Sequence, residues 1–298
     1  MSNAADDHSA TRFVIDARGH RLDLRPGAPD RGAHLMGILN TTPDSFSDGG
    51  QFVTVDAAVS RTAEMLSEGA SIIDIGGEST RPGADPVGEQ EEMDRVVPVI
   101  RAIAERFPDA VLSIDTYKPS VADAALDAGA HIVNDVTGLR QFPEMADVAA
   151  TYGAPIILMH SAGAPGHLTE RPDYEDLEAD VFDTLRTAID RAQAAGVEHI
   201  LTDPGFGFGK SVAENLQLVN RIDRLLDLGY PVLAGISRKS AIGKLLGTDG
   251  SPVPTAKRLF GTLGATAVAL LRGATVIRTH DVRPTAEFLR AMHATLNS

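Results

Sequence analysis

The chain has 298 residues, no cysteine and a net charge of −14, so it can hold one large or two small domains but no disulfide or thiolate metal site. The negative charge disfavours non-specific binding to nucleic acid, although an anionic substrate remains compatible, since binding depends on local charge. No apolar run approaches the roughly 18 residues that a membrane-spanning helix needs, and the polar first residues differ from a secretory signal, so we expect a cytoplasmic protein without membrane or nucleic-acid partners.

The first segment, residues 1–32, reads as a polar extension. Within it, FVIDARGHRLDL fits a short β-hairpin with its turn at Arg18-Gly19-His20. We expect the remaining residues, 33–298, to form one domain.

From residue 34 onward a single unit recurs, in which a short apolar run ends in polar or glycine-rich residues and an amphipathic segment follows. The eight runs are HLMGILN (34–40), SIIDIGG (71–77), VLSIDT (111–116), HIVNDV (131–136), PIILMH (155–160), HILTDP (199–204), PVLAGIS (231–237) and TVIRTH (275–280). The segments between them have helical periodicity, and several end in glycine, as helices often do. Eight strands alternating with helices predict an α/β fold of the (β/α)8 TIM-barrel type. A doubly wound open sheet is the alternative.

Polar residues stand where each predicted strand ends. In strand order they are Asn40; Asp74; Asp115; Asn134 and Asp135; His160; Asp203; Ser237, Arg238 and Lys239; and Arg278 with His280. In such barrels the active site lies at the C-terminal ends of the strands. We therefore expect these groups to share one rim.

Two groups of these residues indicate particular chemistry. Arg278 and His280 are two residues apart and share a strand face, so they form a cationic pair suited to a phosphate or pyrophosphate; the alternative is that one of them pairs with Asp281 or a helix end. The second set comprises Asp115, Asn134 and Asp203. These residues could bind metal, act in acid–base chemistry or accept paired N–H donors of a heterocycle. Alternatively, they could merely form helix caps and ion pairs.

The stretch DPGFGFGKS (203–211) looks like a phosphate-binding loop but misses both nucleotide motifs. A Walker A loop would need glycine at Pro204, and a dinucleotide fingerprint would need it at Lys210. We expect Asp203 to face a ligand, the glycines to let the backbone pass close to it, and Lys210 to lie at the rim or in capping contacts.

Taken together, the motifs resemble the dihydropteroate synthase family over about residues 34–296. They are MGILNTTPDSFSDGG, IIDIGGESTRPGA, SIDT, HIVNDVTG, ILMH, LTDPGFGFGKS, ISRKS and IRTHDV. The resemblance implies a barrel enzyme that joins 6-hydroxymethyl-7,8-dihydropterin pyrophosphate to p-aminobenzoate, releasing 7,8-dihydropteroate and pyrophosphate. It also implies a homodimer, for which the apolar segment LGATAVALLRG could supply a contact, although this segment could equally pack on the barrel itself.

The resemblance assigns roles to individual residues. The pterin side takes Asp115, Asn134, Asp203 and Lys239, with Met159 and Phe208 as apolar walls. The pyrophosphate side takes Asn40, Arg81, Arg278 and His280, with Asn40 helping to hold Mg²⁺. The p-aminobenzoate side takes Phe46, Thr80, Pro82 and Ser237, and Asp74 lies at the floor of the site and orients its neighbours. The expected catalytic groups are Asp115, Lys239, Arg278 and His280.

The implied mechanism is an SN1-like displacement, in which pyrophosphate departs before the amine attacks and the loops 41–52 and 79–88 close. The loop motif GGESTRPG resembles that of sulfonamide-sensitive members, so we expect sensitivity. Two alternatives stay open. One is a methyltetrahydrofolate-dependent corrinoid methyltransferase, which would need no pyrophosphate set. The other is a paralogue that binds pterin but has lost activity.

Overall fold

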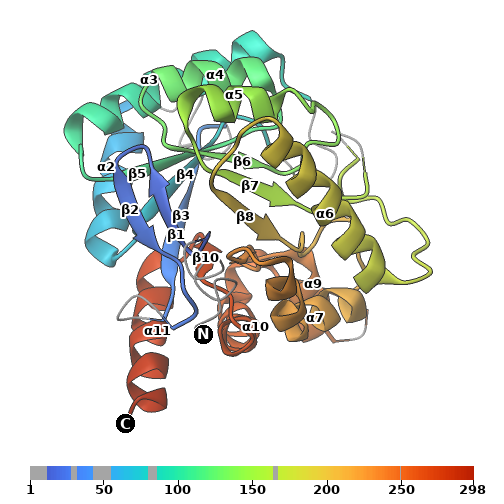
Figure 1. Cartoon of the computed structure of the whole chain (residues 1–298). Coiled ribbons are helices and arrows are strands. Elements are labelled where there is room, and N and C mark those ends of the chain that lie inside the picture. Colours follow the sequence, from blue (N-terminus) through green and yellow to red (C-terminus); the bar gives the residue numbers. More distant parts are fainter. Residues whose placement is uncertain (1–11, 28–31, 43–54, 80–85, 164–166, 249) are drawn as a thin grey trace, which may run out of the picture.

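The computed structural model describes residues 12–27, 32–42, 55–79, 86–163, 167–248 and 250–298. Within these ranges it forms a (β/α)8 barrel preceded by a β-hairpin (Figure 1). None of the helices in the described ranges has the length and apolar character needed to cross a bilayer.

Eight parallel strands form the barrel wall. They are β3 (His34–Asn40), β4 (Ile72–Gly76), β5 (Val111–Asp115), β6 (Ile132–Asp135), β7 (Ile156–Met159), β8 (Ile200–Asp203), β9 (Leu233–Ala234) and β10 (Val276–Thr279). Their order is β8-β7-β6-β5-β4-β3-β10-β9, and a parallel bridge between Thr202 and Val232 joins β8 to the segment entering β9. The ring is thereby closed, which confirms the predicted barrel and sets aside the open sheet.

Helices cover the outside of the barrel (Figure 1). They are α2 (Val55–Glu68), α3 (Glu89–Arg106), α4 (Pro119–Asp127), α5 (Met145–Tyr152), α6 (Leu177–Ala194), α7 (Val212–Asn220), α8 (Ile222–Leu225), α9 (Ser240–Leu246), α10 (Leu259–Leu271) and α11 (Val282–Leu296), with short 3₁₀ turns η2 (Leu226–Leu228) and η3 (Thr255–Lys257). Helix α3 shows why they pack there: its buried Val96, Val99, Ile100 and Ile103 recur at helical spacing and form one apolar face.

The barrel interior is layered, because every second residue of a strand points inward. One apolar residue from each strand forms a common cluster: Met36, Ile72, Val111, Ile132, Ile157, Leu201, Leu233 and Val276. Two residues further along four of these strands come Asp74, Asn134, Asp203 and Arg278. An apolar floor therefore lies beneath a polar layer at the C-terminal ends of the strands.

The N-terminal hairpin closes the other end of the barrel. Its strands are β1 (Val14–Ala17) and β2 (His20–Asp23), and the turn residues Arg18 and Gly19 have φ of 53° and 97°, as a type I′ turn requires. The hairpin side chains that pack against the apolar floor are Ile15, Ala17, Leu22 and Leu24. Hairpin and barrel therefore share one hydrophobic cluster.

Candidate active site

Three strands contribute to an ion-pair cluster inside the barrel. Arg278 of β10 donates from Nε to Asp74 Oδ2 of β4 at 2.6 Å and from Nη2 to Asp115 Oδ2 of β5 at 2.5 Å. Asn134 of β6 adds a hydrogen bond from Nδ2 to the same Asp74 oxygen at 3.2 Å. Asp74 is fully buried. It therefore lies under Arg278 and Asn134 and fixes the direction of both side chains.

Burial and charge oppose each other in this cluster. Burial acts to lower the pKa of Arg278, but Asp74 and Asp115 outweigh it and hold that pKa above its usual value. Burial raises the pKa of Asp115 to about 7, although Arg278 acts to lower it. Arg278 therefore stays charged, whereas Asp115 titrates near neutral pH.

A second cluster joins the loop after β8 to the loop after β9. Asp203 accepts a hydrogen bond from the Gly205 N–H at 2.7 Å, and Lys239 Nζ lies 3.7 Å from the centroid of the Phe208 ring, within range of a cation–π contact. A side chain at Gly207, which has φ of +84°, would come within 2.9 Å of Lys239. Burial lowers the pKa of Lys239 to about 7 and raises that of Asp203.

Ser237 and His280 form a hydrogen-bonded pair beside these clusters. The backbone N–H of His280 donates to Ser237 Oγ at 3.1 Å, and the same hydroxyl oxygen lies 3.0 Å from Nδ1 of the His280 ring. Burial, followed by Arg278, lowers the pKa of His280 to about 3. His280 is therefore neutral at pH 7, so the expected cationic pair carries its charge on Arg278 alone. Asp281 pairs with Arg238 instead, at 2.9 Å, which removes the alternative that it engages Arg278 or His280.

An apolar cluster lies at the same end of the barrel. It contains the two predicted wall residues Met159 and Phe208, together with Tyr117, Val136 and Leu168, and Phe142 packs against it. The additional members carry no sequence signal of their own, because an apolar residue beyond a strand looks the same whether it lines a pocket or the core.

The residues expected on the pyrophosphate and p-aminobenzoate sides are only partly described. Asn40 ends β3 in register with Gly76 of β4. Four predicted residues lie outside the described ranges: Phe46, Thr80, Arg81 and Pro82. Among the residues that are described, no group of three His, Cys, Asp or Glu could hold a metal. The single amide oxygen of Asn40 fits Mg²⁺, an ion that commonly keeps waters and substrate phosphate oxygens as its other ligands.

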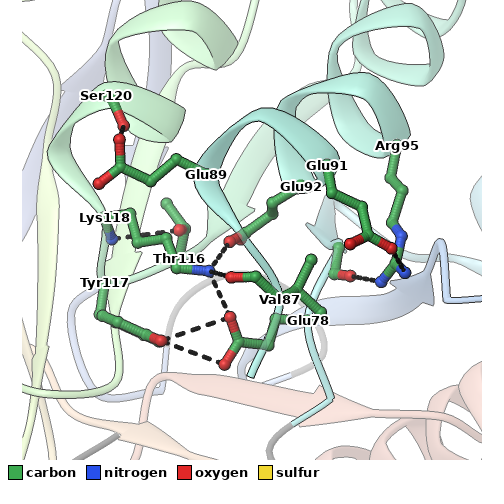
Figure 2. Close-up of polar contacts among 11 residues, drawn as sticks. Glu78, Val87, Glu89, Glu91, Glu92, Arg95, Thr116, Tyr117, Lys118 and Ser120 are labelled. Atoms are coloured by element: carbon green, nitrogen blue, oxygen red, sulfur yellow. Dashed lines mark hydrogen bonds and ion pairs between the residues drawn. The ribbon is translucent and has the colours of Figure 1, made fainter. Parts of the chain in front are cut away.

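A buried lysine network, which sequence reasoning missed, joins the start of α4 to α3 and to the segment after β4 (Figure 2). Lys118 Nζ donates to the Val87 carbonyl at 2.7 Å, to Glu92 Oε2 of α3 at 2.5 Å and to Glu78. Glu78 and Val87 stand on either side of residues 80–85 in the chain. Lys118 therefore ties both flanks of that segment to α3. No sequence signal links these groups, since they come from separate units of the barrel.

The stretch DPGFGFGKS folds as a loop followed by a helix start. Lys210 is half-buried and makes capping contacts, one of the two expected placements: it donates to the carbonyls of Gly205 and Phe208. Ser211 is the N-cap of α7 and forms a capping box with Glu214. The lysine and serine that made the stretch look like a phosphate loop therefore hold its own backbone.

A polar layer of Asp, Asn, Lys and Arg at the C-terminal end of a (β/α)8 barrel suits a flat heterocycle rich in N–H groups. The family model described as pterin binding enzyme matches residues 36–280. Fold and site thus define a pterin-binding barrel enzyme.

Similar proteins narrow this class. A dihydropteroate synthase of Escherichia coli strain K12 is 44% identical over 284 residues, covering 95% of this chain and 96% of the relative. The structure of the Xanthomonas albilineans enzyme with 4-aminobenzoic acid superposes with a TM-score of 0.86 at 44% identity, over 96% and 99% of the two chains. The structure of the Yersinia pestis enzyme with a sulfonamide drug superposes with a TM-score of 0.85 at 45% identity, over 96% of this chain and 100% of the other. The chain belongs to the dihydropteroate synthase family, which confirms the resemblance and sets aside the corrinoid methyltransferase.

Proposed function

We propose that this chain condenses 6-hydroxymethyl-7,8-dihydropterin pyrophosphate with p-aminobenzoate to give 7,8-dihydropteroate and pyrophosphate. The observation that carries the proposal is that acceptor and donor side chains from separate strands and from the loop after β9 converge above the apolar floor: Asp74, Asp115, Asn134, Asp203, Lys239 and Arg278. The related Xanthomonas albilineans structure holds 4-aminobenzoic acid, the second substrate in its acid form.

The pterin ring fits the polar layer chemically. Its aminopyrimidinone edge offers adjacent N–H donors, and the free oxygen of a carboxylate such as Asp203 can accept them. The ammonium of Lys239 can donate to acceptor atoms of the ring. Met159 and Phe208 of the apolar cluster supply the flat contacts that the ring faces need. These contacts would bind the pterin and fix which way its exocyclic carbon points.

The pyrophosphate side rests on Arg278, His280 and Asn40. The charged guanidinium and the neutral imidazole can both donate hydrogen bonds to phosphate oxygens. Asn40 would hold Mg²⁺, which, when bound, neutralises negative charge on the leaving group. Arg81 belongs to the same expected set. The p-aminobenzoate side is assigned to Ser237 and to Phe46, Thr80 and Pro82, on the family resemblance.

The reaction follows from this division of the site. The bond between the exocyclic carbon and the pyrophosphate oxygen breaks, with its electron pair leaving on pyrophosphate. The resulting cation spreads its charge into the pterin ring, which the carboxylates of Asp115 and Asp203 stabilise. The amine of p-aminobenzoate then attacks the carbon, forms the C–N bond and loses a proton to water. No nucleophile from the protein takes part.

An assay of pyrophosphate release tests the proposal. Purified protein with both substrates and Mg²⁺ should release one pyrophosphate per dihydropteroate formed. Binding of pterin without release would instead identify a paralogue that has lost activity. Asp203→Ala should abolish detectable pterin binding, whereas a purely structural Asp203 would lower stability and leave the affinity of the folded fraction unchanged.

Sulfonamide sensitivity is a separate proposal, supported by the drug complex of the Yersinia pestis relative. A cell lacking its own dihydropteroate synthase and carrying this gene should stop growing when a sulfonamide is added. Full growth at high drug concentration would contradict the proposal, and added p-aminobenzoate should restore growth by competition.

We propose a homodimer through the face formed by α7, α9 and α10. Large apolar side chains are exposed there: Leu245, Leu246, Phe260, Val268 and Leu271. Phe260 is 83% and Leu271 62% exposed, and a pocket between α7 and α10 lies beside them. Such a patch commonly marks a protein interface. Sedimentation should give twice the mass of 31.5 kDa, and Phe260→Glu should shift the protein to monomer.

We place the reaction in the cytoplasm, as the sequence predicts. A pyrophosphate ester is a multiply charged anion that does not cross a bilayer unaided, so the enzyme must share a compartment with the reaction that makes its substrate. Cell fractionation followed by the pyrophosphate assay tests this placement.

A further inference from the structure

The ammonium group of Lys210 lies inside the loop that follows β8. Its Nζ donates to the carbonyls of Gly205 and Phe208, both at 3.0 Å, and lies 2.9 Å from His160 Nδ1. An ammonium has three protons, so these three acceptors satisfy it. Lys210 therefore links two points of the loop to the end of the neighbouring strand.

His160 continues this chain of hydrogen bonds to the surface. Its ring is buried, and its Nε2 lies 2.7 Å from Asp180 Oδ1 of α6. Because Nδ1 accepts from Lys210, the single ring proton resides on Nε2 and is donated to Asp180. Burial, together with Lys210, lowers the pKa of His160 to about 4, in agreement with a neutral ring. A continuous chain thus runs from Asp180, 48% of whose side chain is exposed, through His160 to Lys210.

The two carbonyls that Lys210 holds belong to residues that shape the pterin side of the site. The N–H of Gly205 orients Asp203 at 2.7 Å, and the ring of Phe208 lies against Lys239 at 3.7 Å. Gly205 has φ of +71°, and a side chain there would overlap the His160 carbonyl at 1.8 Å. The loop therefore packs directly on His160, and Lys210 Nζ lies on the same side of Gly205, 3.2 Å from the position that such a side chain would take.

We propose that Lys210, held by His160 and Asp180, is a positioning residue for pterin: it fixes the loop in the shape in which Asp203 and Phe208 meet the ring, and does not itself contact the pterin. The inference rests on the proposed function, since it requires pterin to bind Asp203. Loss of the ammonium leaves two buried carbonyls and a ring nitrogen without their donor, and the loop relaxes to satisfy them.

The test compares a variant of Lys210 with a variant of Glu214, which lies in the first turn of α7 just after the loop. Lys210→Met removes the ammonium and keeps the side chain's length, whereas Glu214→Ala removes the capping box of α7 and its pair with Arg171 without touching Gly205 or Phe208. By calorimetry with 6-hydroxymethyl-7,8-dihydropterin pyrophosphate, Lys210→Met should raise Kd about tenfold. Glu214→Ala should leave Kd within about twofold while lowering the melting temperature. The KM for p-aminobenzoate should change little in both.

An unchanged Kd in folded Lys210→Met, or an equal rise in Glu214→Ala, would overturn the inference. If Lys210→Met does not fold, His160 decides the matter. His160→Asn keeps an acceptor near the position of Nδ1 and should bind pterin nearly as the wild type does, whereas His160→Leu should raise Kd about tenfold. Equal Kd values for these two variants would count against the positioning role. Failure of the wild type to bind pterin pyrophosphate would instead overturn the proposed function itself.

Discussion

At the scale of single residues, position along a strand decides function. Asn134 points into the barrel and bonds to Asp74, whereas the next residue, Asp135, accepts from the backbone N–H groups of Thr137 and Leu139 at 2.8 and 2.7 Å. Met159 likewise joins the apolar cluster, while His160 turns toward α6. The sequence identified the polar residues at the strand ends. Whether each side chain points into the barrel or toward the helices depends on the pleat of the strand, which only the structure shows.

Asp115 and Lys239 predict a bell-shaped pH dependence of pterin affinity. Burial raises the pKa of Asp115 to about 7 and lowers that of Lys239 to about 7. Below this value Asp115 gains a proton and loses the negative charge that attracts N–H donors; above it Lys239 loses its positive charge. The affinity for 6-hydroxymethyl-7,8-dihydropterin, which has no phosphate to titrate, should therefore fall on both sides of about pH 7.

Variants separate the two limbs of that profile. Asp115→Asn should bind pterin weakly and without the acidic limb, and Lys239→Met should lose the basic limb. Fluorescence titrations across the pH range supply the measurement. A wild-type affinity that stays flat through neutral pH would show that neither group titrates in contact with the ligand.

At the scale of elements, alternating apolar runs and amphipathic segments were sufficient to predict the barrel. The lengths of the strands were harder to predict, since the apolar run 231–237 forms a strand of only two residues, β9. The Lys118 network was missed for a different reason. Its partners Glu78 and Glu92 lie 40 and 26 residues from Lys118 in the chain. Helical periodicity does not predict which distant carboxylate a buried lysine pairs with.

The same network predicts a large effect on stability. Lys118→Met leaves Glu78 and Glu92 buried without their cation, so the free energy of unfolding should fall by about 3–5 kcal/mol. Ser120→Ala removes a hydrogen bond to Glu89 at the exposed side of the same helix pair and should cost less than about 1 kcal/mol. Urea unfolding of both variants measures the difference. Similar losses in the two would mean that the buried network contributes no more than a surface contact.

At the scale of the whole molecule, the hairpin makes the barrel sensitive to acid. His131 accepts from the Leu112 N–H at 3.0 Å, and its ring lies 4.5 Å from that of His20 beside Arg18. Burial, then His20 and Arg18, lowers the pKa of His131 to about 4. The unfolded chain thus binds more protons than the folded chain below the ordinary histidine pKa, so stability is full above about pH 6.5 and is lost as pH falls toward 4.

Allowing for the partial exposure of the His131 ring, its titration should lower the free energy of unfolding by about 1 kcal/mol between about pH 7 and about pH 5. His131→Asn, which keeps an acceptor for the Leu112 N–H, should lose less over the same interval. Urea unfolding at the two pH values makes the comparison. If wild type and variant lose stability equally, the acid sensitivity arises elsewhere, for which His280 and His160 are the next candidates because burial lowers their pKa values to about 3 and about 4.

The closure of the ring has a consequence for how the protein is made. β10 pairs with β3, and Arg278 of β10 meets Asp74 and Asp115, which precede it by 204 and 163 residues. A ribosome must therefore have released nearly the whole chain before the barrel can close, and the contacts of its central cation form among the last. Until then β3 has an unpaired edge that invites association with other chains. Nascent chains halted before β10 should accordingly lack pterin binding and depend on chaperones.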